Sequence, residues 1–164
     1  MGASGWSHRV AHRDDVQAAL DELRADVFAR GDYTKQWELL PALLGDLADE
    51  VASYGGDAES VARLRRGEPP RTIEEALGWS TTEGTHSVLD TPTVGDTPGF
   101  GVITPADPSL LIDLFGTDRP DAAAVWAARD ELDESIDDRW AGIYVVGYEG
   151  GKPSTIVFVG VSGD

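Results

Sequence analysis

Residues 140–149, WAGIYVVGYE, and residues 154–163, STIVFVGVSG, are two β-strand patterns separated by a Gly-Gly pair at 150–151. Apolar side chains occupy both alternating faces of each run, which is typical of strands covered on both sides. The glycine pair between them predicts a hairpin turn. We therefore expect strands at 140–148 and 154–161, paired as a hairpin at the centre of a sheet.

The hairpin is preceded by a helical pattern over residues 121–138, DAAAVWAARDELDESIDD. Val125, Leu132 and Ile136 fall on one side of this helix and mark the face that it buries. Thr117 or Asp118 is expected to cap its N-terminus. The sequence thus predicts one long helix that packs on the hairpin.

The remainder of the chain supplies further strands and helices of ordinary length. Short strands are expected at residues 6–10, 85–91 and 100–104, and helices at 15–30, 40–53, 58–66, 72–77 and 109–115. Hairpins and helices in this order favour the α+β class. We expect a single domain over residues 1–164, with residues 1–5 disordered and an antiparallel sheet of four to five strands with helices packed on it.

Composition restricts the classes of function. The chain has a formal net charge of -17 and no cysteine, so thiol chemistry and disulfides are excluded. An acidic field repels phosphate backbones, which argues against nucleic-acid binding. No apolar run is long enough for a membrane span or a secretory signal, so we expect no membrane association and a cytoplasmic location. The acidity has two explanations that the sequence leaves open: a functional surface, or the composition of a GC-rich or salt-adapted genome.

The densest acidic segment lies in the expected C-terminal helix. Six acidic residues occur in the nine positions 130–138, namely Asp130, Glu131, Asp133, Glu134, Asp137 and Asp138. The segment lacks the glycine and the alternating ligands of a calcium loop. Like charges on one helix face repel one another, and a basic protein partner would relieve that repulsion. These six residues are the predicted partner-binding surface, as expected for a small inhibitor or an immunity- or antitoxin-type protein.

The segment GTHSVLD, residues 84–90, carries the residue types of a hydrolytic site. In the expected strand, His86 and Asp90 lie on one face and Ser87 lies on the other, which argues against a catalytic triad. His86 and Asp90 remain the alternative catalytic pair, for a small hydrolase- or isomerase-like enzyme. Whether the chain is an enzyme stays uncertain at this point, and the absence of catalytic motifs favours a protein without catalytic activity.

Other candidate sites lack the required spacing. His8 and His12 are separated by the expected boundary between strand and helix, and no zinc-type ligand pattern occurs. The glycine-rich segment 95–101, GDTPGFG, does not follow a strand–helix unit as a dinucleotide loop would. We therefore expect an irregular turn there, and neither a cofactor nor a metal site.

Three phrases of the sequence resemble those of small bacterial proteins, chiefly from actinobacteria. They are GTHSVLD at 84–90, LFGTDRP at 114–120 and the terminal GVSGD at 160–164. The resemblance extends over most of the chain from about residue 6. It implies no activity, cofactor or site. A third function therefore stays open beside the binding protein and the enzyme: a structural component of a larger assembly, which an exposed apolar face of strands 140–161 would favour.

Overall fold

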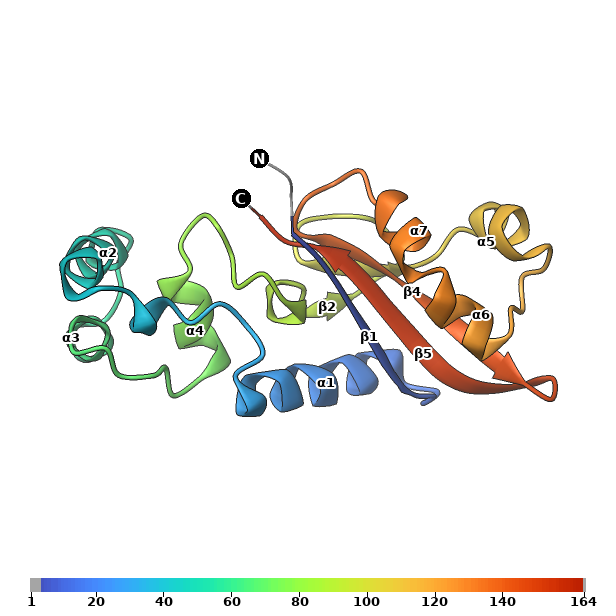
Figure 1. Cartoon of the computed structure of the whole chain (residues 1–164), viewed down its shortest axis with the longest axis horizontal. Coiled ribbons are helices and arrows are strands. Elements are labelled where there is room, and N and C mark those ends of the chain that lie inside the picture. The colour runs from blue at the N-terminus through green and yellow to red at the C-terminus, as the bar shows by residue number, and fades with distance from the viewer. Residues whose placement is uncertain (1–3, 164) are drawn as a thin grey trace.

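The computed structural model describes residues 4–163 and places a five-stranded sheet at the centre of the chain (Figure 1). The strands are β1 (Gly5–Ala11), β2 (Thr93–Val94), β3 (Val102–Pro105), β4 (Ala141–Glu149) and β5 (Lys152–Val161). Their order across the sheet is β1-β5-β4-β3-β2. The expected α+β class is confirmed.

The sheet is mixed, and the expectation of an antiparallel sheet is wrong for two of the strands. β1 and β4 flank β5 in antiparallel pairs, whereas β3 pairs with β4 in parallel and β2 pairs with β3 in parallel. A parallel pair requires a crossover connection. Here the helices between β3 and β4 supply it, because they return the chain to the end of the sheet from which β3 starts.

Seven α-helices surround the sheet in the described part of the chain. They are α1 (Val16–Arg30), α2 (Pro41–Ser53), α3 (Ala58–Arg65), α4 (Ile73–Trp79), α5 (Pro108–Phe115), α6 (Ala122–Ala127) and α7 (Arg129–Glu134), with 3-10 turns at η1 (Gln36–Glu38) and η2 (Val88–Asp90). Figure 1 shows α1 on one side of the sheet, α5 to α7 on the other, and α2 to α4 grouped beyond one end of it. No helix within residues 4–163 has the length and apolar character needed to cross a membrane.

The central hairpin has the predicted form. β4 and β5 pair from Ala141–Val161 to Glu149–Lys152, with a turn at 150–151. Both faces of β5 are buried: Phe158 packs toward α1, and Val157 packs toward the helices on the opposite side. The hairpin is therefore the central, doubly covered element that its apolar pattern indicated.

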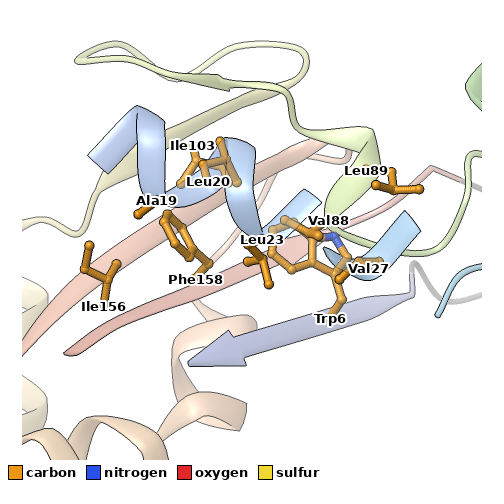
Figure 2. Packing of buried hydrophobic residues seen from close by; sticks show 10 residues of the cluster. All are labelled: Trp6, Ala19, Leu20, Leu23, Val27, Val88, Leu89, Ile103, Ile156 and Phe158. Carbon is orange, nitrogen blue, oxygen red and sulfur yellow. The ribbon is translucent and has the colours of Figure 1, made fainter. Parts of the chain in front are cut away.

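The core on the α1 side joins β1 and β5 to one face of α1 (Figure 2). Leu20, Leu23 and Val27 repeat at helical spacing and are buried against Trp6 and Phe158. Asp15 caps the helix by accepting a hydrogen bond from the amide of Ala18, and Gly31 ends it in the left-handed conformation. The predicted strand and helix in this region are confirmed.

The helices α2, α3 and α4 have a core of their own. Trp79 lies at its centre, 1% exposed, and its indole N–H donates to Ser60 Oγ at 2.9 Å. The buried guanidinium of Arg63 pairs with the carboxylates of Glu59 and Glu75. The chain that follows α4 connects this small bundle to the sheet.

The predicted long helix over 121–138 is two shorter helices. Asp121, and neither Thr117 nor Asp118, caps α6 by accepting hydrogen bonds from the first amides of that helix. The chain then bends at Ala128 before α7, which ends at Glu134. Val125 and Leu132 are fully buried as expected, because the bend keeps both side chains on the sheet.

The expected disorder of residues 1–5 is wrong for the two residues that the structure describes. Gly5 begins β1, and the carbonyl oxygen of Ser4 accepts a hydrogen bond from the amide of Ser162. Residues 1–3 lie outside the described part of the chain.

Candidate functional site

The segment 84–92 is a tight turn, so the expected strand over 85–91 is wrong. Ser87 Oγ accepts a hydrogen bond from the amide of Leu89 and starts the 3-10 turn η2. His86 has a φ of +53°, far from the extended conformation of a strand. Hydroxyl and carboxylate side chains that bond to nearby backbone compete with strand pairing, and this segment contains three of them.

Asp90 holds this turn together. Its Oδ1 accepts hydrogen bonds from the amide and from the hydroxyl of Thr85, both at 2.8 Å, and that hydroxyl also lies 2.8 Å from Ser87 Oγ. Asp90 is 3% exposed. Its second oxygen, Oδ2, is buried and has no hydrogen-bond partner among the described residues. Such groups are rare in folded proteins and call for an explanation.

His86 and Asp90 do not form the expected pair on one strand face. His86 Nδ1 lies 2.7 Å from Ser4 Oγ, next to the start of β1. No hydrogen bond or ion pair joins His86 to Asp90, both of which are described. A general base must reach the proton that it moves. The turn conformation separates the two side chains, since the period of two that would align them exists only in a strand.

A cavity of about 610 Å³ lies beside the turn, next to the end of α4 and to the residues that immediately precede β3 and β4. Most of its wall is apolar, and it also carries two threonine side chains and Asp90. The lining residues are Leu77, Thr81, Thr82, Asp90, Pro92, Phe100, Gly101 and Trp140. They come from four separate segments, so no local motif could have indicated the cavity.

Two aromatic rings form one wall of this cavity. Phe100 and Trp140 lie with ring centroids 5.2 Å apart, and Phe100 is 78% exposed. The carbonyl oxygen of Trp140 accepts a hydrogen bond from the amide of Gly101 at 2.7 Å, which fixes the start of β4 beside β3. The glycine-rich segment 95–101, expected as an irregular turn, therefore presents Phe100 at the mouth of a cavity. Its glycines were the only sequence signal of this feature.

Backbone strain is concentrated around the same cavity. Within residues 4–163, the non-glycine residues with positive φ are Thr81 at +48°, His86 at +53° and Trp140 at +58°. The left-handed conformation is costly for β-branched and bulky residues. Thr81 and Trp140 line the cavity, and His86 belongs to the adjoining turn. Strained residues of this kind cluster at functional sites.

The acidic residues of 130–138 form a second candidate site, and one of the six points toward the sheet rather than to solvent. Five of the six predicted partner-binding residues are exposed: Asp130, Glu131, Glu134, Asp137 and Asp138. Asp133 instead points toward β1, where its carboxylate occupies the space that a side chain at Gly5 would fill. Burial raises the pKa of Asp133, and the neighbouring charges of Asp130 and Glu134 raise it further.

Ion pairing is sparse in the acidic segment 130–138. A single pair, Arg129–Asp130 at 3.7 Å, involves one of the six acids in the described chain. The same arginine stacks over the ring of Trp126 at 5.2 Å and donates to the Trp126 carbonyl oxygen. Arg9 lies 5.3 Å from the centroid of the same ring. Arg129 is thus shared between Trp126 and Asp130, and Arg9 lies against Trp126.

The other two histidines lie outside any ligand cluster. Burial and the charge of Arg30 lower the pKa of His8 in β1, and Asp32 and Asp26 act in the opposite direction. The backbone amide of His12 donates to the carbonyl oxygen of Ser154. Across residues 4–163 no group of three or more histidine or carboxylate side chains is placed to hold a metal ion.

Comparisons of the chain with protein-family models, with curated proteins and with solved structures give no match.

Proposed function

We propose that the protein is a non-enzymatic binding module that engages a basic protein partner through the exposed acids of segment 130–138. The observation that carries the proposal is the density of exposed acids in this segment. Five acids are exposed on one short segment, and one of them is in an ion pair. Two acids of α1, in contrast, are paired with arginines: Glu22 with Arg13 and Asp26 with Arg30. Some exposed acids elsewhere, such as Asp46 and Asp113, also lack an ion pair in the described structure, but segment 130–138 is distinguished by five exposed acids within nine residues.

Electrostatic repulsion within segment 130–138 favours a basic partner. Asp130 and Glu134 stand four residues apart on α7, so their charges repel each other. Two more acids, Asp137 and Asp138, follow the C-terminus of that helix, where the helix dipole disfavours negative charge. A basic surface placed against the segment would remove both penalties. It would also accelerate association, since complementary charge steers the encounter. Small acidic inhibitors, including those of the immunity or antitoxin type, are a class with this profile.

The two alternatives have less support. The enzymatic proposal required His86 and Asp90 to face the same space, and His86 is instead bonded to Ser4. The structural-component proposal would be favoured by an exposed apolar face of β4 and β5, but β5 is buried on both faces and the residues of β4 between Ala141 and Tyr148 are buried or half-buried. No contact among the described residues specifically supports either alternative.

Charge reversal provides the test. The triple variant Asp130→Lys, Glu134→Lys and Asp137→Lys is expected to lower the affinity for a basic partner by a factor of ten or more and to flatten its dependence on salt. Isothermal titration calorimetry against a panel of small basic proteins, at several salt concentrations, measures both effects.

A matched variant controls for net charge. Asp46, Glu50 and Asp113 are exposed acids on α2 and α5 without ion pairs in the described structure, and reversing all three changes the net charge by the same amount. This control is expected to retain most of the affinity. Equal losses in both triple variants would show that total charge, rather than segment 130–138, governs binding, and unchanged binding in the first variant would refute the proposal.

A further inference from the structure

We propose that the cavity between η2 and Trp140 binds a small organic cation with a planar apolar body, which donates a hydrogen bond to Asp90 Oδ2. This site is separate from the acidic segment 130–138, and the proposal does not depend on a protein partner. Its size fits the purpose, since small-molecule pockets enclose roughly 300–1,000 Å³ and this cavity encloses about 610 Å³.

The buried carboxylate is the first observation. Asp90 meets the needs of its own turn through Oδ1, which accepts both hydrogen bonds from Thr85. Oδ2 takes no part in that network and has no hydrogen-bond partner within residues 4–163. A buried acceptor left unpaired costs free energy that one donor would recover. A ligand N–H placed in the cavity that Asp90 lines is such a donor.

The charge of the surroundings selects a cation. Among the described residues, no lysine, arginine or histidine lines the cavity. Arg24 of α1 reaches the same turn and its charge interacts with that of Asp90, but its guanidinium donates to the carbonyl oxygen of Leu89 at 3.0 Å, and no ion pair within 4.0 Å joins these two described residues. The chain as a whole carries a net charge of -17. An anionic ligand would therefore be repelled both by the site and by the protein field.

The aromatic wall selects a planar body. Phe100 and Trp140 lie side by side along the cavity, with Leu77 and Pro92 as further apolar lining. Aromatic rings stack on planar groups and attract cations over their faces. Phe100 is 78% exposed, an arrangement that leaves its ring available to a ligand at the mouth.

Entry of the ligand requires a small movement of Trp140. Oδ2 is covered: a side chain at Gly84 would meet both this oxygen, at 2.9 Å, and the edge of the Trp140 indole, at 2.7 Å. The indole thus lies over the approach to the carboxylate. Trp140 has a strained φ of +58°, and displacement of its ring by the ligand would be visible as a shift of the indole N–H resonance.

Titration followed by two-dimensional NMR tests the proposal, with benzamidine as the cationic planar probe. Benzamidine is expected to give saturable shifts at the amides of Thr81, Thr82 and Gly101 and at the Trp140 indole. Benzamide, its neutral analogue, should bind at least about tenfold more weakly, because a charged hydrogen bond is stronger than a neutral one. Benzoate should not bind. Absence of saturable shifts with benzamidine, or equal affinity for benzoate, would overturn the proposal.

Substitution of Asp90 tests the site more directly than a change of probe does. Asp90→Asn retains an oxygen that can accept from Thr85 and replaces only the unpaired acceptor by a donor. It should weaken benzamidine binding by about tenfold or more, whereas Asp113→Asn, at an exposed acid of α5, should leave it unchanged. Phe100→Ala tests the wall without touching the turn and should weaken binding severalfold. Full affinity in both Asp90→Asn and Phe100→Ala would refute the site.

Two further titrations distinguish a small-molecule cation from a protein side chain and separate this proposal from that of the acidic segment. N-acetyl-arginine amide carries the same planar cation as a protein side chain would, and we expect it to bind more weakly than benzamidine. Tighter binding of the arginine amide would overturn the assignment to a small molecule. The triple charge reversal at Asp130, Glu134 and Asp137 should leave benzamidine binding intact, so failure at one site does not imply failure at the other.

Discussion

Carboxylates occupy two regions of this protein under opposite physical conditions. In segment 130–138 five acids are exposed to solvent, and one of them has an ion pair. In the turn 84–92 a single acid, Asp90, is buried and fixed by two hydrogen bonds, with one oxygen left over. The first region has many charges that water screens. The second has one carboxylate whose surroundings determine what it can bind.

The difference shows that the number of carboxylates in a region does not determine how much each one contributes to stability or binding. Exposed acids act through a long-range field, so removal of any one of them changes little. A buried carboxylate acts through contacts at hydrogen-bond distance, where loss of the group leaves its donors unsatisfied. Segment 130–138 is therefore suited to a large charged surface, and Asp90 to a small ligand with a defined donor.

The largest expected effect is the loss of the Asp90 carboxylate. Asp90→Ala removes the acceptor of both Thr85 hydrogen bonds and should lower the free energy of unfolding by about 3 kcal/mol. Asp130→Ala, in the exposed segment, should change it by less than about 0.5 kcal/mol. Urea denaturation followed by circular dichroism measures both. Similar values for the two variants would contradict the distinction drawn between buried and exposed acids.

A smaller effect is expected from filling the space between Asp90 and Trp140. Gly84 has a φ of +80°, and a β-carbon there would lie 2.7 Å from the Trp140 ring and 2.9 Å from Asp90 Oδ2. Gly84→Ala combines backbone strain with these overlaps and should lower stability by about 2 kcal/mol. Gly116, with a φ of +73° and open space around it, is the matched control.

Gly116→Ala should lower stability by about 1 kcal/mol, the cost of the left-handed backbone alone. The difference between the two glycine variants isolates the steric term at the cavity. Equal losses of stability in the two variants, by thermal and urea denaturation, would show that a methyl group fits beneath Trp140 without overlap. The turn 84–92 would then be less tightly packed than the structure indicates.

The sequence predicted the parts of the fold that depend on local patterns. Alternating apolar residues in β4 and β5, and the Leu20–Leu23–Val27 spacing in α1, follow directly from burial of one or both faces. The parallel pairing of β3 was not predictable in this way. It depends on how three short helices return the chain to the sheet, which is a property of the connection rather than of the strand.

The candidate sites divide in the same manner. The acids of 130–138 are adjacent in sequence, so their clustering was evident, although the inward orientation of Asp133 was not. The cavity at Asp90 joins Leu77, Pro92, Phe100 and Trp140 from distant segments, and no local pattern records their proximity. The turn 84–92 was misread because Val88 and Leu89 suggested a strand, whereas the side chains of Thr85, Ser87 and Asp90 bond to one another instead.

The smallest expected effect concerns Asp133, which belongs to segment 130–138 but is partly buried against β1. Its pKa is raised from the ordinary value of 3.8, mainly by burial and further by Asp130 and Glu134. A carboxyl whose pKa is higher in the folded state destabilises the fold when it is ionised, so the penalty appears as pH rises through the folded pKa. Asp133→Asn should remove that penalty and stabilise the protein by about 0.5 kcal/mol near pH 7, a figure reduced for its partial exposure.

The pH dependence distinguishes this explanation from a simple packing change. Below the ordinary pKa of 3.8, Asp133 is protonated in both the folded and the unfolded chain, so the advantage of Asp133→Asn should disappear there. Urea midpoints of the two proteins, measured from pH 7 down to the acid limit of folding, test this convergence, with Asp113→Asn as an exposed control that should match the unsubstituted protein throughout. A constant difference at all pH values would assign the effect to packing, and Asp133 would then differ from its exposed neighbours in contacts rather than in charge.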